Sequence, residues 1–214
     1  MEQAVTGVIL AGGKNRRMGG TPKALLEFRN ERLLHRQIRQ LRQRCAEILL
    51  VTNDPVLFRP HLDGDIRVIA DVYPGCGPLG GMHAAFSAAR FPLVWLVGCD
   101  MPFISPSAAF LMLQRLEPST CDAVIPRIGG RLHPLHGIYH PRCADVIPGM
   151  LESQRYKIGE FLQRIRCRPL DQSVFREEGI DPRFVCNVNS PEDYRAALAL
   201  DDMAADPADP GRRS

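Results

Sequence analysis

A glycine-rich and strongly basic turn follows the first apolar run of the chain. The run ends at Gly12 and Gly13, and because neither residue has a Cβ atom, main-chain N–H groups there can approach phosphate oxygens closely. Basic side chains surround this turn: Lys14, Arg16, Arg17 and Lys23. Their charge would stabilise a triphosphate and the extra negative charge that develops when it is cleaved. We therefore predict that the turn binds a nucleoside triphosphate.

Two common phosphate-binding motifs do not match this turn. The dinucleotide motif G-x-G-x-x-G is absent because the glycines come as adjacent pairs, and the P-loop motif fails because Lys23 is followed by alanine. The alternative interpretation is a surface turn with solvated charges. A loop this long and this basic, directly after a buried strand, favours the phosphate site.

A lone carboxylate, Asp100, follows the apolar run Leu93–Val97. Magnesium prefers one or two carboxylates together with phosphate oxygens and water, so Asp100 and a bound nucleotide would complete its shell. The alternative role is a helix cap, but Ser105 followed by Pro106 supplies a better one. We predict that Asp100 binds Mg²⁺.

Other polar residues have weaker signals. Asn53 and Asp71 each follow a predicted strand, but such residues are also common in turns for backbone reasons alone, and both readings stay open. His133 and His136 would face opposite sides of a strand, so a metal site that includes them and His140 is disfavoured.

The elements that position these residues alternate between strands and helices. Apolar runs predict buried parallel strands at Thr6–Ala11, Glu47–Thr52, Ile66–Ala70, Leu93–Val97 and Ala123–Arg127. Helices are expected where Leu34, Ile38, Leu41 and Cys45 form one apolar stripe, over Gly81–Ala89, and from Ser105-Pro106 onward. This order predicts a doubly wound, three-layer α/β/α fold with a mostly parallel sheet, whose ligands lie beyond the carboxyl ends of the strands.

The second half of the chain has a looser pattern. We expect a hairpin at Gly129–Arg131, a strand at Pro134–Tyr139, helices at Cys143–Glu152 and Ile158–Arg164, and a last helix from Ser190 to about Leu200. The prediction is one domain over residues 1–200, with a nucleotide-binding half at about 6–127 and an acceptor-binding half at about 128–200. Residues 201–214 are expected to be disordered.

Composition excludes several classes of protein. With 27 basic and 24 acidic residues, the net charge of +3 is too small to indicate a nucleic-acid partner. Seven cysteines are scattered singly, without the paired spacing of zinc or redox sites. The sequence has no run long enough for a membrane helix and no basic leader, so we expect a cytoplasmic protein.

The stretch Leu10-Ala11-Gly12-Gly13 through Arg16-Arg17-Met18-Gly19 to Lys23 resembles the signature of the molybdenum cofactor guanylyltransferases. Three further segments are similar to that family: Cys99–Pro102, Gly77–Gly81 and Asn187–Asp193. The resemblance spans about Thr6 to Leu200. It implies a Rossmann-like nucleotidyltransferase fold, Mg²⁺ as cofactor, GTP and molybdopterin as substrates, and transient contact with carrier or recipient enzymes of the cofactor.

The resemblance also assigns roles to residues. It implies that the nucleotide contacts Leu10, Ala11, Gly12, Gly13, Asn53, Asp71, Gly77, Pro78 and Leu79. It assigns the phosphates to Lys23 and Arg17, with Asp100 as the catalytic metal ligand. On the acceptor side it indicates Arg131, His133, Asn187 and Asn189.

One position departs from the family pattern. Pro22 stands where the family has aspartate, and Pro-Lys is common in cytidylyl and uridylyl transferases. The expected reaction transfers GMP from GTP to the phosphate of molybdopterin. The alternatives are another pair, such as CTP with molybdopterin or a nucleotide with a sugar phosphate, and a noncatalytic carrier that binds GTP or the cofactor.

Overall fold

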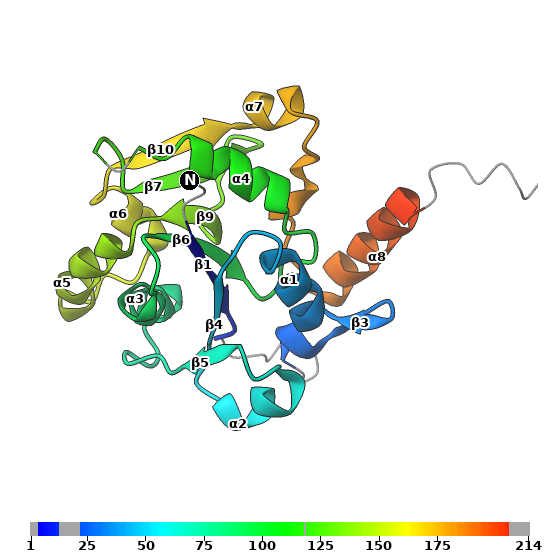
Figure 1. The fold of residues 1–214 in the computed structure, drawn as a ribbon, viewed down its shortest axis with the longest axis horizontal. Coiled ribbons are helices and arrows are strands. Elements are labelled where there is room, and N and C mark those ends of the chain that lie inside the picture. The colour runs from blue at the N-terminus through cyan, green and yellow to red at the C-terminus, as the bar shows by residue number, and fades with distance from the viewer. Residues whose placement is uncertain (1–3, 13–21, 118, 206–214) are drawn as a thin grey trace, which may run out of the picture.

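One mixed sheet forms the centre of the molecule (Figure 1). The computed structural model describes residues 4–12, 22–117 and 119–205. Within this part of the chain the sheet order is β10-β7-β9-β6-β1-β4-β5, with β8 paired to β7. The strands are β1 (Val5–Leu10), β4 (Glu47–Val51), β5 (Arg67–Ile69), β6 (Leu93–Gly98), β7 (Ala123–Ile128), β8 (Arg131–Leu132), β9 (His136–Tyr139) and β10 (Cys167–Asp171).

The parallel part of the sheet confirms the predicted fold class. β1 pairs in parallel with both β4 and β6, and the register places Leu10 opposite Gly98. β9 lies antiparallel between β6 and β7, which makes the sheet mixed. The five predicted strands are all present. β1, β4 and β6 are runs buried from both faces, whereas β5 is a short, half-buried strand at the edge of the sheet.

Helices cover both faces of the sheet, as expected for three layers. One face packs against α1 (Leu33–Leu41), α4 (Pro106–Gln114) and α7 (Gln172–Glu177), and the other packs against α3 (Pro78–Ala88), α5 (Ile147–Glu152) and α6 (Ile158–Leu162). Figure 1 shows these two groups on opposite sides. No helix in the described ranges has the length and apolar character needed to cross a membrane.

The helix starts follow local sequence signals. The Ser105 side chain accepts a hydrogen bond from the Ala108 N–H (3.1 Å), which confirms the predicted cap of α4. α3 begins at Pro78, earlier than predicted, because Gly77 has a φ of 65° and proline suits the first helical position. In α1 the predicted stripe is buried at Leu34, Ile38 and Leu41, while Cys45 lies beyond the end of the helix.

The predicted end of the last helix is wrong. α8 (Pro191–Ala205) continues past Leu200, because Asp201 and Asp202 pair with Arg29. The predicted disorder of the tail is therefore corrected for residues 201–205, while residues 206–214 lie outside the described part. α8 packs on the hairpin of β2 (Glu27–Phe28) and β3 (Glu31–Arg32), where the Tyr194 and Phe28 rings meet edge to face.

Other differences concern the second half. The predicted helix at Cys143–Glu152 is a 3₁₀ helix, η3 (Pro141–Val146), followed by α5. β10 and α7 were not predicted, and neither were α2 (Pro55–Phe58) and the 3₁₀ helix η2 (Arg59–His61). The division into nucleotide-binding and acceptor-binding halves remains an expectation.

Candidate active site

The candidate site lies at the carboxyl ends of β1 and β6. These neighbouring strands lead to connections that run in opposite directions across the sheet, which is the switch point where open α/β sheets bind ligands. The Cys99 N–H donates to the Leu10 carbonyl (3.1 Å), and the Ala11 N–H donates to the Val51 carbonyl (2.8 Å). These bonds bring Leu10, Ala11 and Gly12 beside the segment that carries Asp100.

Lys23 connects the candidate residues. Its ammonium donates to Asp100 Oδ2 (3.2 Å) and to Asn189 Oδ1 (2.7 Å). The side chains of Lys23 and Asp100 keep 21% and 18% of their surface exposed, so the pair is accessible to a ligand from solvent. A cation, a carboxylate and an amide oxygen from three distant parts of the chain thus meet at one point.

The backbone around Lys23 is preset by Pro22. Pro22 has a φ of −57° and caps the short 3₁₀ helix η1 (Lys23–Leu25), and its carbonyl accepts a hydrogen bond from Leu25 (2.9 Å). Because proline fixes φ near this value, little conformational freedom is lost when the turn forms. Pro22, the residue that departs from the family pattern, therefore helps to orient Lys23.

The closing segment, residues 187–190 directly before α8, contacts the other side of this cluster. The Val188 N–H donates to the Asp100 carbonyl (2.8 Å). Asp193 accepts hydrogen bonds from the N–H groups of Asn189 (2.9 Å) and Ser190 (3.0 Å), while Ser190 Oγ accepts one from the Asp193 N–H (3.1 Å). The bond from Asn189 is the main reason why the pKa of Asp193 lies below its usual value. This reciprocal cap fixes the loop that presents the Asn189 side chain.

Asp71 follows β5, and its carboxylate lies against the first turn of α3, near the loop predicted to surround the base and ribose. Asp71 Oδ1 accepts a hydrogen bond from the Tyr73 N–H (2.8 Å). A Cβ atom at Gly80 would lie 2.7 Å from both Asp71 carboxylate oxygens, so only glycine fits there. The loop before α3 contains Gly75 and Gly77, both with positive φ, which explains its glycine content.

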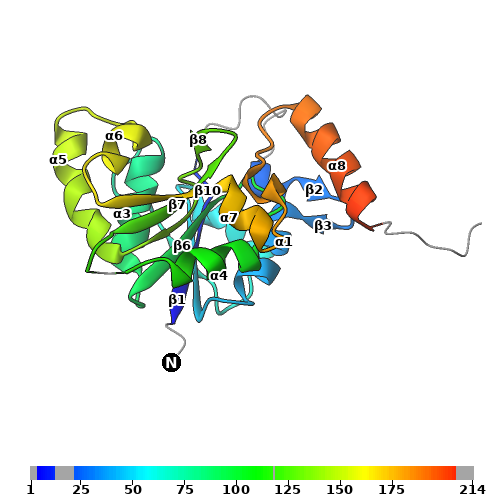
Figure 2. The same ribbon diagram turned by 90° about the horizontal axis from the view of Figure 1, so that it is seen from above.

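The remaining predicted residues are not part of the bonded cluster, which consists of Lys23, Asp100 and Asn189. Asn53 is exposed just after β4, and Arg131 and Asn187 are also exposed. His133 is half-buried, its N–H donates to the Pro126 carbonyl (2.9 Å), and burial lowers the pKa of its imidazole. Figure 2 shows β8, which carries Arg131, rising on the side opposite the N-terminal end of β1, as α8 does. Gly13 and Arg17 lie outside the described residues.

His136 has a structural position. It is fully buried on β9, and its Nε2 accepts a hydrogen bond from the Ser105 N–H (3.2 Å). Burial lowers the pKa of His136 to about 3, so the ring is neutral at physiological pH. The described ranges contain no group of three or more His, Cys, Asp or Glu side chains arranged to hold a metal ion.

Asp100 nevertheless suits a hard cation that takes most of its ligands from a nucleotide. Its Oδ1 lies over Gly98, where an added Cβ atom would come within 2.9 Å. One carboxylate that is partly exposed to solvent suits Mg²⁺ when phosphate oxygens and water supply the other ligands.

The fold belongs to the class of doubly wound α/β proteins that bind ligands at the switch point of the sheet, where a lysine and a carboxylate face each other in this chain. Residues 7–168 match the family model described as "MobA-like NTP transferase domain". The chain belongs to the MobA-like NTP transferase family, and it is accordingly a nucleotidyltransferase.

Curated relatives agree with this assignment, and a solved structure shares the fold. The chain is 36% identical over 196 residues to a "Probable molybdenum cofactor guanylyltransferase" of Pelotomaculum thermopropionicum, covering 91% of this chain and 92% of the relative. It is 33% identical to a "Molybdenum cofactor guanylyltransferase" of Syntrophotalea carbinolica, with 87% of each chain covered. Molybdopterin-guanine dinucleotide biosynthesis protein A from Archaeoglobus fulgidus has a similar fold, with a TM-score of 0.78, 23% identity, and coverage of 92% of this chain and 99% of that chain.

Proposed function

We propose that this protein transfers the GMP group of GTP to the terminal phosphate of molybdopterin. The contact of Lys23 with both Asp100 and Asn189 is the observation that carries this proposal, because it joins a phosphate-binding cation to a metal-binding carboxylate. The relatives named as molybdenum cofactor guanylyltransferases support the choice of substrates.

In the proposed reaction, an oxygen of the molybdopterin phosphate attacks the α-phosphorus of GTP. The new P–O bond forms as the bond to the β-phosphate oxygen breaks, and pyrophosphate leaves with the electron pair. The products are the guanine dinucleotide form of the cofactor and pyrophosphate. This transfer needs no covalent intermediate on the protein, because positioning and charge stabilisation suffice.

The protein's own residues supply the positioning and part of the charge. Lys23 would move from Asp100 to the phosphates and stabilise the negative charge that grows on the leaving group. Arg17 is proposed to act in the same way. Asp100 would hold Mg²⁺, which, when bound, neutralises phosphate charge and orients the triphosphate.

The loop before α3 is proposed to bind the base and ribose. Gly75 and Gly77 adopt positive φ angles that residues with a side chain rarely adopt, so the loop can bring its backbone close to a ligand, and Pro78 begins α3 beside them. Leu10, Ala11, Gly12, Gly13, Asn53, Asp71 and Leu79 are proposed to complete the nucleotide site. The local structural role of Pro22 in orienting Lys23 accounts for this residue without a change of base.

The acceptor is proposed to bind between the β8 hairpin and the closing segment. Arg131 is exposed, and His133 and Asn187 are partly or fully accessible, so their polar groups are available to the anionic phosphate and the polar pterin. Asn189 would link the two substrates, because it already contacts Lys23.

The test is pyrophosphate release from each of the four ribonucleoside triphosphates, with and without molybdopterin. We expect release from GTP that requires both molybdopterin and Mg²⁺, and loss of at least 99% of it in Asp100→Asn. The matched control is Asp65→Asn, because Asp65 is an exposed carboxylate that pairs with Arg42 just before β5.

Each other outcome points to a named alternative. Pyrophosphate release from CTP in preference to GTP would show that cytosine, not guanine, is the base. Pyrophosphate release with a sugar phosphate would show that molybdopterin is not the acceptor. Tight GTP binding without pyrophosphate release would identify a carrier. Full activity in Asp100→Asn would exclude the role given to Asp100.

A further inference from the structure

The loop that carries Asp100 is held by a buried glutamine of α1. Gln37 is fully buried, and its Nε2 donates to the carbonyls of Gly98 (2.7 Å) and Met101 (2.9 Å). Both hydrogens of the amide are thereby used on the two sides of Asp100. Gln37 Oε1 has no hydrogen-bond partner within the described part of the chain, so the side chain acts here as a donor.

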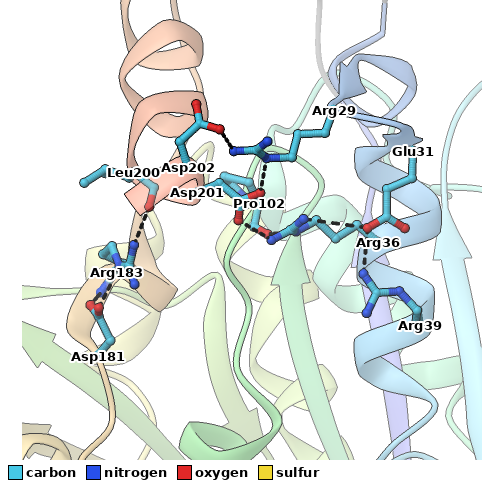
Figure 3. A network of polar contacts seen from close by, with 10 residues as sticks. All are labelled: Arg29, Glu31, Arg36, Arg39, Pro102, Asp181, Arg183, Leu200, Asp201 and Asp202. Carbon is cyan, nitrogen blue, oxygen red and sulfur yellow. Dashed lines mark hydrogen bonds and ion pairs between the residues drawn. The ribbon is translucent and has the colours of Figure 1, made fainter. Parts of the chain in front are cut away.

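Arg36, the preceding residue of α1, holds the next carbonyl of the same loop. Its Nε donates to the Pro102 carbonyl (2.9 Å), and its Nη2 donates to Asp201 Oδ1 in α8 (2.7 Å). Figure 3 shows the Arg36 side chain with Pro102 and Asp201 on one side and Glu31 on the other. The guanidinium carbon also lies 5.1 Å from the centre of the Phe28 ring, so the side chain is fixed by charge and by stacking.

The closing segment completes the set of bonds. Val188 holds the Asp100 carbonyl, so the carbonyls at positions 98, 100, 101 and 102 all accept hydrogen bonds from outside the loop. A carbonyl that is held fixes the plane of its peptide. The direction in which the Asp100 side chain leaves the backbone is thus set from α1 on one side and from the segment before α8 on the other.

A purely stabilising role does not explain a glutamine at this position. The buried face of α1 is otherwise made of leucine and isoleucine: Leu33, Leu34, Ile38 and Leu41. A buried amide in such a stripe costs free energy unless it is fully bonded, and here its carbonyl oxygen, Oε1, has no partner within the described residues. The two donor bonds to the Asp100 loop are what this residue provides that an apolar residue would not.

We propose that Gln37 and Arg36 are positioning residues, which fix the backbone on both sides of Asp100 so that its carboxylate keeps the orientation required to bind the divalent cation. This inference rests on the proposed role of Asp100. Groups that orient a metal ligand typically contribute 10- to 100-fold to metal affinity, although they do not touch the metal.

The test measures how much Mg²⁺ strengthens GTP binding. The dissociation constant of GTP is measured by isothermal titration calorimetry with excess Mg²⁺ and again with EDTA, and the ratio of the two is the metal enhancement. We expect Gln37→Met, which keeps the side-chain size but removes both donors, to reduce the enhancement about tenfold. Its affinity in EDTA should stay within about twofold of the wild-type value.

Thr6→Val is the matched control. Thr6 is also fully buried, and its hydroxyl donates to Glu47 Oε2 (2.9 Å) near the opposite end of β1. This variant should lower the melting temperature but leave the metal enhancement unchanged. Equal weakening of GTP binding with Mg²⁺ and with EDTA in Gln37→Met would indicate general damage to the fold and would overturn the inference.

Arg36→Met provides a second measurement that does not depend on Gln37→Met folding. It removes the bond to Pro102 and should reduce the enhancement about threefold. An unchanged enhancement in Arg36→Met would overturn the role of Arg36. If Gln37→Met does not fold, the same result would overturn the whole inference. Wild-type protein without any enhancement, or Asp100→Asn with full enhancement, would instead refute the proposed metal site. An enhancement that is lost in Asp100→Asn but intact in Gln37→Met would refute the positioning role alone.

Discussion

The bonded cluster at the ends of β1 and β6 differs from the surface around β8 in how its polar groups are held. In the cluster, Lys23 contacts both Asp100 and Asn189, and the backbone on each side of Asp100 is fixed. Around β8, Arg131 is exposed and is part of no such cluster. Charges that stabilise a transition state must be preorganised, whereas groups that recognise an acceptor can be ordered when it binds.

Replacing Lys23, the cation of the bonded cluster, is the strongest test of this difference between the two regions. Lys23→Gln should lower kcat by about 100-fold, because a preorganised charge that acts on the leaving phosphates contributes on that scale. Steady-state pyrophosphate release at saturating GTP gives the value. Lys157→Gln, at an exposed lysine before α6, is the control and should be unaffected. A kcat within threefold of wild type in Lys23→Gln would show that the bonded cluster is not preorganised for catalysis.

The stability of the sheet between the two regions should depend on pH through the buried His136. The folded pKa of about 3 lies below the unfolded value of about 6.5, so the stabilising contribution of the neutral ring is complete above pH 6.5 and is lost as the pH falls toward 3. At pH 5 the loss should be about 2 kcal/mol of unfolding free energy.

Urea unfolding between pH 7 and pH 5 measures this loss. His136→Gln, which keeps an acceptor for the Ser105 N–H, should be less stable at pH 7 but should show a smaller pH dependence. His35→Gln, at an exposed imidazole of α1, should retain the wild-type dependence. Identical pH dependence in wild type and His136→Gln would show that the buried ring is not what makes the region sensitive to acid.

The smallest expected effect is at the acceptor surface. Arg131→Ala should raise the KM for molybdopterin about tenfold and leave the KM for GTP unchanged, because one charge-assisted contact contributes about that factor. Arg155→Ala, at another exposed arginine of the same half, is the control. If the KM for GTP rises instead, Arg131 belongs to the nucleotide site and not to the acceptor surface.

The sequence predicts the first half of the fold well because its signals are local. The strands around β1 are apolar runs, and Ser105 with Pro106 marks the start of α4. Asp100 could be identified because it directly follows such a run. Lys23 could be identified as one of the basic residues around the glycine-rich turn, and the family resemblance added the asparagines Asn187 and Asn189.

The parts that were not predicted depend on contacts between distant segments. β10 contains Pro169 and alternates too weakly to be recognised, and it becomes a strand only by pairing with β7. α8 extends to Ala205 because Arg29 and Arg36 meet Asp201, 172 and 165 residues apart in sequence. The contact between Lys23 and Asn189, separated by 166 residues, likewise has no local signature, and Asn189 was expected only on the acceptor side.

The position of Lys23 also bears on the order in which ligands enter. Before any ligand binds, its ammonium already neutralises Asp100, so a lone divalent ion would meet a positive charge in its path. A triphosphate offers the lysine a new partner and frees the carboxylate at the same moment. We therefore expect weak binding of the ion alone and joint entry of ion and nucleotide, which would spare the enzyme from being trapped in a complex with free metal.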